Sequence, residues 1–276
     1  MSEQISTILV GLPGSGKTSF IAALWHILNE KKHSLKLNIR QSDRKYLEEI
    51  HAKWAVFEEI ERSNTGTFYS IELDIIKDDS KVLKLNFPDV SGELYKDIYD
   101  SRTISSNLSK KMMNTNSILL FIHPNSLKVD RYIGDVVKPN EIDEAHVEEQ
   151  DLSNLTNFEI SQSQAIITDL IIALKNRNKI KNIAVIVSAW DTIKDFTPEK
   201  YIKESCPLFH MFLKNSGIKY KIWGVSAQGG DYKNNQDMRQ IQEYEDLTER
   251  IRIVDCEGEN NDISLPLNWL IEQNEN

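Results

Sequence analysis

The stretch with the clearest chemistry lies near the start of the chain. Residues 11–18 read Gly-Leu-Pro-Gly-Ser-Gly-Lys-Thr, the phosphate-loop pattern of Gly, four residues, Gly, Lys and Ser or Thr. Its glycines let backbone N–H groups point at phosphate oxygens, and a following helix adds its partial positive charge. Lys17 is expected to reach the β- and γ-phosphates and the Thr18 hydroxyl to bind Mg²⁺. The predicted phosphate-binding residues are Gly11, Pro13, Gly14, Ser15, Gly16, Lys17, Thr18 and Ser19.

The pattern is flanked by the elements that such a loop requires. Residues 5–10 are apolar and rich in β-branched side chains, which predicts a buried strand. Residues 18–28 carry apolar side chains at helical spacing, namely Phe20, Ile21, Leu24, Ile27 and Leu28. A glycine-rich turn without a ligand is the alternative, but a full match between a strand and a helix favours a phosphate site.

A second acidic motif follows a predicted β-hairpin over residues 68–87, in which apolar and polar side chains alternate. The hairpin runs directly into Pro-Asp-Val-Ser-Gly-Glu at residues 88–93. Asp89 thus ends an apolar strand, where the second acidic metal contact of a phosphate-loop site is expected. The spacing of Asp89 and Gly92 is weak evidence alone, and it gains weight from the hairpin and phosphate loop before it.

Further buried strands are predicted at residues 117–123, 183–187 and 220–225. The last two end in Ser188-Ala189-Trp190-Asp191 and Ser226-Ala227-Gln228. Strands that alternate with helices predict a three-layer α/β fold of the P-loop NTPase type. We expect a mostly parallel, six-stranded sheet with one antiparallel strand from the hairpin. Ligands of such sheets bind beyond the carboxyl ends of the strands, so all four motifs are predicted to meet at one edge.

Length and composition narrow the class of protein. The chain has 276 residues, a net charge of -9 and two cysteines without metal-type spacing. These features predict one domain over residues 1–276, in the cytoplasm, without nucleic-acid binding or membrane insertion. Two insertions are expected, one helical at about 42–62 and one polar at about 125–161, which holds six acidic residues between 141 and 151. The second is either a solvated mobile segment or a docking element for a partner.

In this order, the motifs resemble those of GTPases of the translation-factor-related (TRAFAC) class, which contains the Ras-like switches. The resemblance covers residues 5 to about 230, and Ser-Ala-Trp-Asp stands where the class has Asn-Lys-x-Asp. It implies that Asp191 accepts hydrogen bonds from guanine N1–H and the exocyclic amine, a donor pair that adenine lacks. Ser188 would replace the asparagine. Ala189 cannot replace the lysine, which leaves the strength of guanine selection open.

The resemblance also assigns the remaining site residues. Ser226, Ala227 and Gln228 match the last motif, Ser-Ala-Lys, in which the alanine N–H meets guanine O6. The first switch should supply a threonine that senses Mg²⁺ and the γ-phosphate, either Thr67 or Thr65. Glu93 stands where Ras-like proteins have the glutamine that orients water, which predicts slow hydrolysis. The expected catalytic residues are Lys17, Thr67 and Glu93. The expected metal ligands are Thr18, Thr67 and Asp89. Further nucleotide contacts are expected from Gly92, Ser188, Asp191, Ser226, Ala227 and Gln228.

The C-terminal stretch, with Arg-Ile-Val-Asp at 252–255 and Pro-Leu-Asn-Trp-Leu at 266–270, resembles the end of bacterial double-GTPase-type proteins. These are predicted in conflict systems against phage. The resemblance implies a regulatory switch with GTP as substrate, GDP as product, Mg²⁺ as cofactor and a protein effector as partner. The effector would contact the switch regions or the 125–161 insertion. Two alternatives stay open: a nucleotide-binding scaffold with little hydrolysis, and an ATP-dependent P-loop NTPase.

Overall fold

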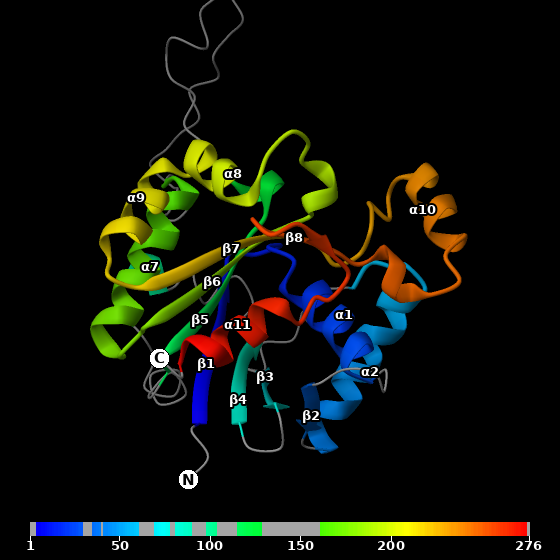
Figure 1. Ribbon diagram of the computed structural model, residues 1–276, viewed down its shortest axis with the longest axis horizontal. Coiled ribbons are helices and arrows are strands. Elements are labelled where there is room, and N and C mark those ends of the chain that lie inside the picture. Colours follow the sequence, from blue (N-terminus) through cyan, green and yellow to red (C-terminus); the bar gives the residue numbers. More distant parts are fainter. Residues whose placement is uncertain are drawn as a thin grey trace, which may run out of the picture.

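The computed structural model describes residues 4–29, 35–39, 41–60, 69–77, 81–89, 98–103, 115–128 and 161–274. Within these ranges one nine-stranded sheet has the order β2-β3-β4-β1-β5-β6-β7-β8-β9 (Figure 1). The strands are β1 (Gln4–Gly11), β2 (Leu35–Ile39), β3 (Tyr69–Lys77), β4 (Lys81–Asp89), β5 (Ser117–Ile122), β6 (Asn182–Ser188), β7 (Lys219–Ser226), β8 (Arg252–Val254) and β9 (Glu259–Asn260).

The centre of the sheet is parallel and its margins are antiparallel. Strands β4, β1, β5, β6 and β7 run in one direction. Strand β3 is antiparallel to β2 and β4, and β8 is antiparallel to β7 and β9. The predicted mixed α/β class with a mostly parallel core is therefore confirmed, as is the hairpin.

The predicted number of strands was wrong. The described residues form nine strands instead of six, and two of them, β3 and β8, oppose the central direction. The added strands are short and lie toward the margins of the sheet: β2 has five residues, β8 three and β9 two. In β2, Leu35 is buried while Lys36 and Asn38 are exposed, so only one face of this strand joins the core. So few residues give almost no periodic signal from which a strand can be predicted.

Helices cover both faces of the sheet and complete three layers. The helices are α1 (Lys17–Asn29), α2 (Gln41–Ala55), α7 (Ser163–Arg177), α8 (Pro198–Ser205), α9 (Pro207–Asn215), α10 (Asn235–Gln242) and α11 (Leu265–Gln273). Buried residues of α1, α2 and α11 share one core cluster with Leu9, Phe121 and Trp223 of the sheet. Those of α7, α8 and α9 share the other with Val10, Leu120 and Val185.

Two helical segments differ from their expected bounds. The helix of the 42–62 insertion begins at Gln41 and ends at Ala55. The apolar spacing of residues 201–213 predicts one helix, but the structure has two, α8 and α9, because Pro207 has no N–H to continue the hydrogen-bond ladder of α8. Most of the acidic 125–161 insertion lies outside the described residues.

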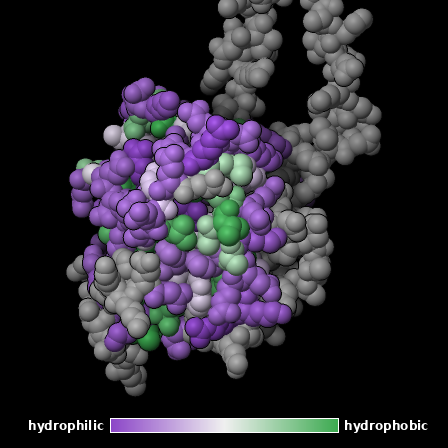
Figure 2. All heavy atoms as spheres, turned by 90° about the vertical axis from the view of Figure 1, so that its right-hand side faces the viewer, coloured by the Kyte–Doolittle hydropathy of each residue, from purple (hydrophilic) through white to green (hydrophobic). Residues whose placement is uncertain are grey.

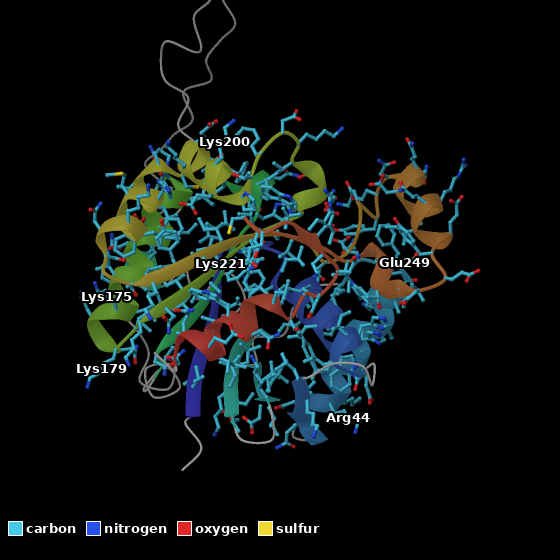
Figure 3. All side chains as sticks on the ribbon, in the orientation of Figure 1. Arg44, Lys175, Lys179, Lys200, Lys221 and Glu249 are labelled. Carbon is cyan, nitrogen blue, oxygen red and sulfur yellow. The ribbon has the colours of Figure 1, made fainter. Side chains whose placement is uncertain are left out.

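Charged side chains are distributed around the outside of the molecule. Figure 3 labels Arg44 on α2, Lys175 on α7 and Lys200 on α8, and these lie far apart on the periphery. Figure 2 shows the side of the molecule that carries α10 and α2. The described surface there is mainly hydrophilic, with a small hydrophobic area near its middle. Among the described helices, none combines the length and apolar character needed to cross a membrane.

Candidate nucleotide-binding site

The phosphate-loop residues form a tight turn between β1 and α1. Lys17 is the first residue of α1, and its Nζ donates hydrogen bonds to the carbonyl oxygens of Gly11 (2.8 Å) and Leu12 (3.0 Å). The same ammonium lies 3.0 Å from Ser15 Oγ. The lysine head group is therefore held over the loop, at the helix N-terminus where backbone N–H groups have no helical partner.

The first glycine of the loop is required by close packing. A Cβ on Gly11 would lie 2.5 Å from Ser15 Oγ and 2.9 Å from both Cβ and the carbonyl oxygen of Phe121 on β5. Any side chain here would separate the loop from the neighbouring strand. The sequence pattern predicted a glycine for loop curvature, and the structure adds a steric reason.

The last glycine of the loop joins the two halves of the site. Gly16 has φ +82°, and a Cβ there would lie 2.9 Å from Ser188 Cβ and 3.1 Å from Ser188 Oγ. Ser188 ends β6, is buried, and donates from Oγ to the carbonyl oxygen of Ile122 at 3.3 Å. The phosphate loop and the Ser-Ala-Trp-Asp segment are thus in contact, as expected of motifs at one sheet edge.

The residues after Ser188 form a sharp turn. Ala189 has a left-handed backbone with φ 48° and ψ 44°, an uncommon conformation for a residue with a side chain, and a 3-10 turn, η3 (Trp190–Thr192), follows. Trp190 is 3% exposed, and its ring fills the space where a Cβ of Gly224 would lie. Trp190 therefore packs in the core, while Asp191 stays half-buried at the sheet edge.

His123, directly after β5, shares the surroundings of Asp191. Burial lowers the pKa of His123 from its usual 6.5, and the charge of Asp191 acts in the opposite direction. Its Nδ1 accepts a hydrogen bond from the backbone N–H of Asn125 at 3.2 Å. His123 was not among the predicted site residues, since a single histidine before a proline carries no recognisable motif.

The third loop of the site follows β7. Ser226 is 2% exposed, and its Oγ accepts a hydrogen bond from the N–H of Gly229 at 3.2 Å. Ala227 and Gln228 are half-buried between these two residues. Strand pairing sets Ser188 opposite Val225, so this loop begins beside the end of β6.

The remaining predicted residues are only partly described. Thr18 is the second residue of α1, and Asp89 is the last residue of β4, for which only the backbone is described. Pairing of Ile8 with Asn86 brings the end of β4 to the same edge as Gly11. Thr65, Thr67, Gly92 and Glu93 lie outside the described residues, so their predicted roles stay predictions. Within the ranges given above, no group of three or more His, Cys, Asp or Glu side chains is placed so that it could hold a metal ion.

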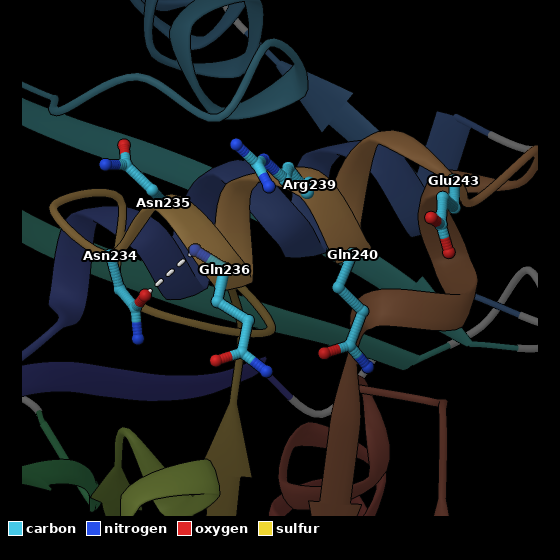
Figure 4. Close-up of a pocket in the computed structure, with 6 residues that line it drawn as sticks. All are labelled: Asn234, Asn235, Gln236, Arg239, Gln240 and Glu243. Carbon is cyan, nitrogen blue, oxygen red and sulfur yellow. Dashed lines mark hydrogen bonds between the residues drawn. The ribbon is translucent and has the colours of Figure 1, made fainter.

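A separate open pocket lies along α10. Six polar or charged side chains line it, from Asn234 to Glu243, and Asn234 accepts a hydrogen bond from the N–H of Gln236 (Figure 4). None of the predicted nucleotide contacts is among these lining residues.

Comparison with protein families matches residues 8–270 to the model described as Double-GTPase 1. The chain belongs to this family. The match includes all four motifs and the C-terminal stretch, and it confirms the resemblance to double-GTPase-type proteins. No curated protein matches the chain.

Solved structures show weaker similarity. The Saccharomyces cerevisiae Ski7 GTPase-like domain bound to GDP and inorganic phosphate is 15% identical with TM-score 0.46, over 99% of this chain and 50% of that one. The GTP-bound form of the same domain is 13% identical with TM-score 0.45, and the match covers 99% of this chain and 50% of that one. Methanosarcina barkeri Roco2 RocCORdC bound to GDP is 12% identical with TM-score 0.35, and the match covers 87% of this chain and 48% of that one. The chain thus spans half or less of these structures, and the assignment depends on the family match alone.

Proposed function

We propose that this protein binds GTP with Mg²⁺ at the carboxyl edge of its parallel strands and acts as a slowly hydrolysing regulatory switch. The observation that carries the proposal is the contact of Gly16 with Ser188. It joins a lysine-containing phosphate loop to the segment that ends in Asp191. A single nucleotide can then reach both, with its phosphates at the loop and its base at the carboxylate.

The phosphate end of the ligand would bind the loop. Backbone N–H groups at the start of α1 and the ammonium of Lys17 supply donors and positive charge there. The three donors of the Lys17 ammonium meet the carbonyl oxygens of Gly11 and Leu12 and the Oγ of Ser15, so at least one of these hydrogen bonds would be exchanged for a phosphate oxygen on binding.

The base end would be read by two groups, one after β6 and one after β7. The Asp191 carboxylate would accept from N1–H and the exocyclic amine of guanine, and the Ala227 N–H would donate to O6. The class has a lysine where Ala189 stands, and the missing stem leaves one face of the base with less cover. We therefore expect guanine selection to depend mainly on Asp191.

The oxygen donors near the loop fit Mg²⁺. This ion prefers hydroxyl, carboxylate and phosphate oxygens, and the Thr18 hydroxyl and Asp89 carboxylate are of this type. The parallel pairing of β1 with β4 supports their meeting at one edge. When bound, Mg²⁺ would neutralise charge on the phosphates. Thr67, or alternatively Thr65, would supply a further oxygen.

Hydrolysis would depend on positioning and charge neutralisation. Lys17 would stabilise charge on the transferred group, and Glu93 would hold the attacking water. A glutamate adds negative charge near the γ-phosphate, which favours a slow reaction. The γ-phosphate would order the segments around Thr67 and residues 89–93, and its loss would release a protein effector. A role in defence against phage follows only from the resemblance to double-GTPase-type proteins.

Calorimetry with GTP, GDP and ATP in Mg²⁺ tests the binding. We expect both guanine nucleotides to bind and ATP to bind at least tenfold more weakly. Lys17→Ala should abolish binding, whereas Lys200→Ala, at an exposed position on α8, should not change it. Asp191→Asn should shift preference toward xanthine nucleotides. Tight GTP binding by Lys17→Ala would contradict the phosphate site.

Single-turnover hydrolysis tests the switch. Slow phosphate release from GTP, faster in the presence of a partner, is the expected result. No release over hours, with or without partners, would favour the scaffold. Equal competition of ATP with a fluorescent GTP analogue would favour an ATP-dependent protein.

A further inference from the structure

The loop after β7 is held from outside by a side chain of α2. Trp54 Nε1 donates a hydrogen bond of 2.8 Å to the carbonyl oxygen of Ala227, across a sequence separation of 173 residues. Trp54 is 1% exposed, so the donor side of this bond is shielded from water. Together with the bond from Gly229 N–H to Ser226 Oγ, it fixes the loop at two points.

Trp54 is itself held by a buried cation. The Arg250 guanidinium lies 3.7 Å from the Trp54 ring centroid and donates hydrogen bonds to the carbonyl oxygens of Trp54 and Ala55. A positive charge at these last carbonyls of α2 is favourable because the helix C-terminus carries partial negative charge. Burial lowers the pKa of Arg250 only to about 10, so it remains cationic at neutral pH.

Arg250 also contacts the far end of the same loop. Gly229 has φ +87°, and a Cβ there would lie 2.9 Å from Arg250 Cβ. Trp54 and Arg250 thus reach the loop from two directions while they contact each other. Trp54 also packs against His26 of α1, with ring centroids 5.3 Å apart, and α1 is the helix that begins with Lys17. Figure 1 shows α1 and α2 side by side below the segment that leads to α10.

We propose that Trp54 is a positioning residue for base recognition, which acts by holding the carbonyl group of Ala227. This inference depends on the proposed function. The N–H that would meet guanine O6 and the carbonyl that Trp54 holds lie in adjacent peptide planes, which join at the Cα of Ala227. Holding the second plane limits the backbone rotations by which the first can turn away from the base. Without the Trp54 bond, the Ala227 N–H would sample directions that miss O6. The resulting loss of affinity would appear only for ligands that bear a good hydrogen-bond acceptor at position 6.

The matched variants are Trp54→Phe and Trp223→Phe. Both keep an aromatic ring and remove a buried N–H, but Trp223 Nε1 has no hydrogen-bond partner within the described ranges. Affinities for GDP, IDP and 6-thio-GDP are to be measured. IDP keeps O6 and lacks the amine read by Asp191, whereas 6-thio-GDP keeps the amine and has a weakly accepting sulfur at position 6.

We expect Trp54→Phe to weaken GDP and IDP by the same factor, about two- to tenfold for one hydrogen bond, and 6-thio-GDP by less. Trp223→Phe should leave all three unchanged. Equal losses for all three ligands would assign Trp54 a purely structural role, and unchanged GDP affinity would also overturn the proposal. Hydrogen exchange over residues 226–230 should be faster in Trp54→Phe alone. If the wild-type protein bound no guanine nucleotide, the proposed function would fail. Unchanged hydrogen exchange in Trp54→Phe would separately show that the Trp54 hydrogen bond does not restrain the loop.

Discussion

Replacing Gly16 by alanine tests the contact that joins the two halves of the site. At φ +82° the backbone of a residue with a side chain is strained by about 1–2 kcal/mol. Part of this cost is offset because alanine lowers the conformational entropy of the unfolded chain. The new Cβ would also lie 2.9 Å from Ser188 Cβ, a separation that real Cβ contacts do not reach. Relief of such an overlap in a packed region costs about 1–3 kcal/mol. The free energy of unfolding should therefore fall by about 2–4 kcal/mol.

Gly217 provides the matched control. Its φ is +70°, but a Cβ there has nothing within 4 Å, so Gly217→Ala carries the backbone strain without the overlap. The difference between the two variants in urea unfolding, measured without nucleotide, isolates the contact with Ser188. We expect Gly16→Ala to be the less stable by about 1–3 kcal/mol.

A double-mutant cycle with Ser188→Gly identifies the partner. The serine side chain is the group overlapped, so its removal should restore the part of the loss that comes from the overlap, about 1–3 kcal/mol, and leave the backbone strain. Ser188→Gly alone measures the separate loss of its 3.3 Å bond to Ile122. Equal destabilisation by Gly16→Ala and Gly217→Ala, with a coupling energy below about 0.5 kcal/mol in the cycle, would refute the contact and with it the joined site.

Three further predictions follow from titratable groups. Asp191→Asn should lower the pKa of His123 further, as followed by NMR titration, because the charge of Asp191 now opposes the effect of burial. Burial raises the pKa of the Cys206 thiol from 9.0 to about 12, so between these values the unfolded chain loses its proton first. The free energy of unfolding should then fall by up to about 1.4 kcal/mol per pH unit, and Cys206→Ala should flatten that slope. Burial, His26 and Arg250 lower the pKa of His51, so below pH 6.5 the unfolded chain binds the proton first; stability should fall with acid, and less steeply in His51→Gln.

The local parts of the site were predictable because their signals are local. A phosphate loop needs glycines at fixed positions between a strand and a helix, and eight consecutive residues specify it. The hairpin of β3 and β4 was equally clear, because apolar and polar side chains alternate over residues 69–75 and 83–87 and so identify the buried face. Family membership then agrees with the order in which these motifs occur.

The supports of the site were not predictable, since they join residues distant in sequence. Trp54 has the helical spacing of an ordinary core residue, and nothing near it in the chain indicates a bond to Ala227. Arg250 is charged and yet 3% exposed, which only the surrounding α2 carbonyls and Trp54 ring explain. The left-handed backbone of Ala189 is likewise a product of tertiary packing, because alanine has no local preference for it.

The error in strand number left the placement of the site intact, and the topology explains why. The three strands beyond the predicted six, β2, β8 and β9, lie at the two margins of the sheet, whereas the four motifs follow four of the five parallel strands of the centre. Pairing of Gly11 with Phe121 and of Ser188 with Val225 sets the ends of those strands level. A nucleotide site of this kind depends on the order and direction of the central strands, and a marginal strand affects it only through what packs on its loops. In this chain α2 and Arg250 pack on the loop after β7, which is why Trp54 is the residue that should reveal whether that packing reaches the base.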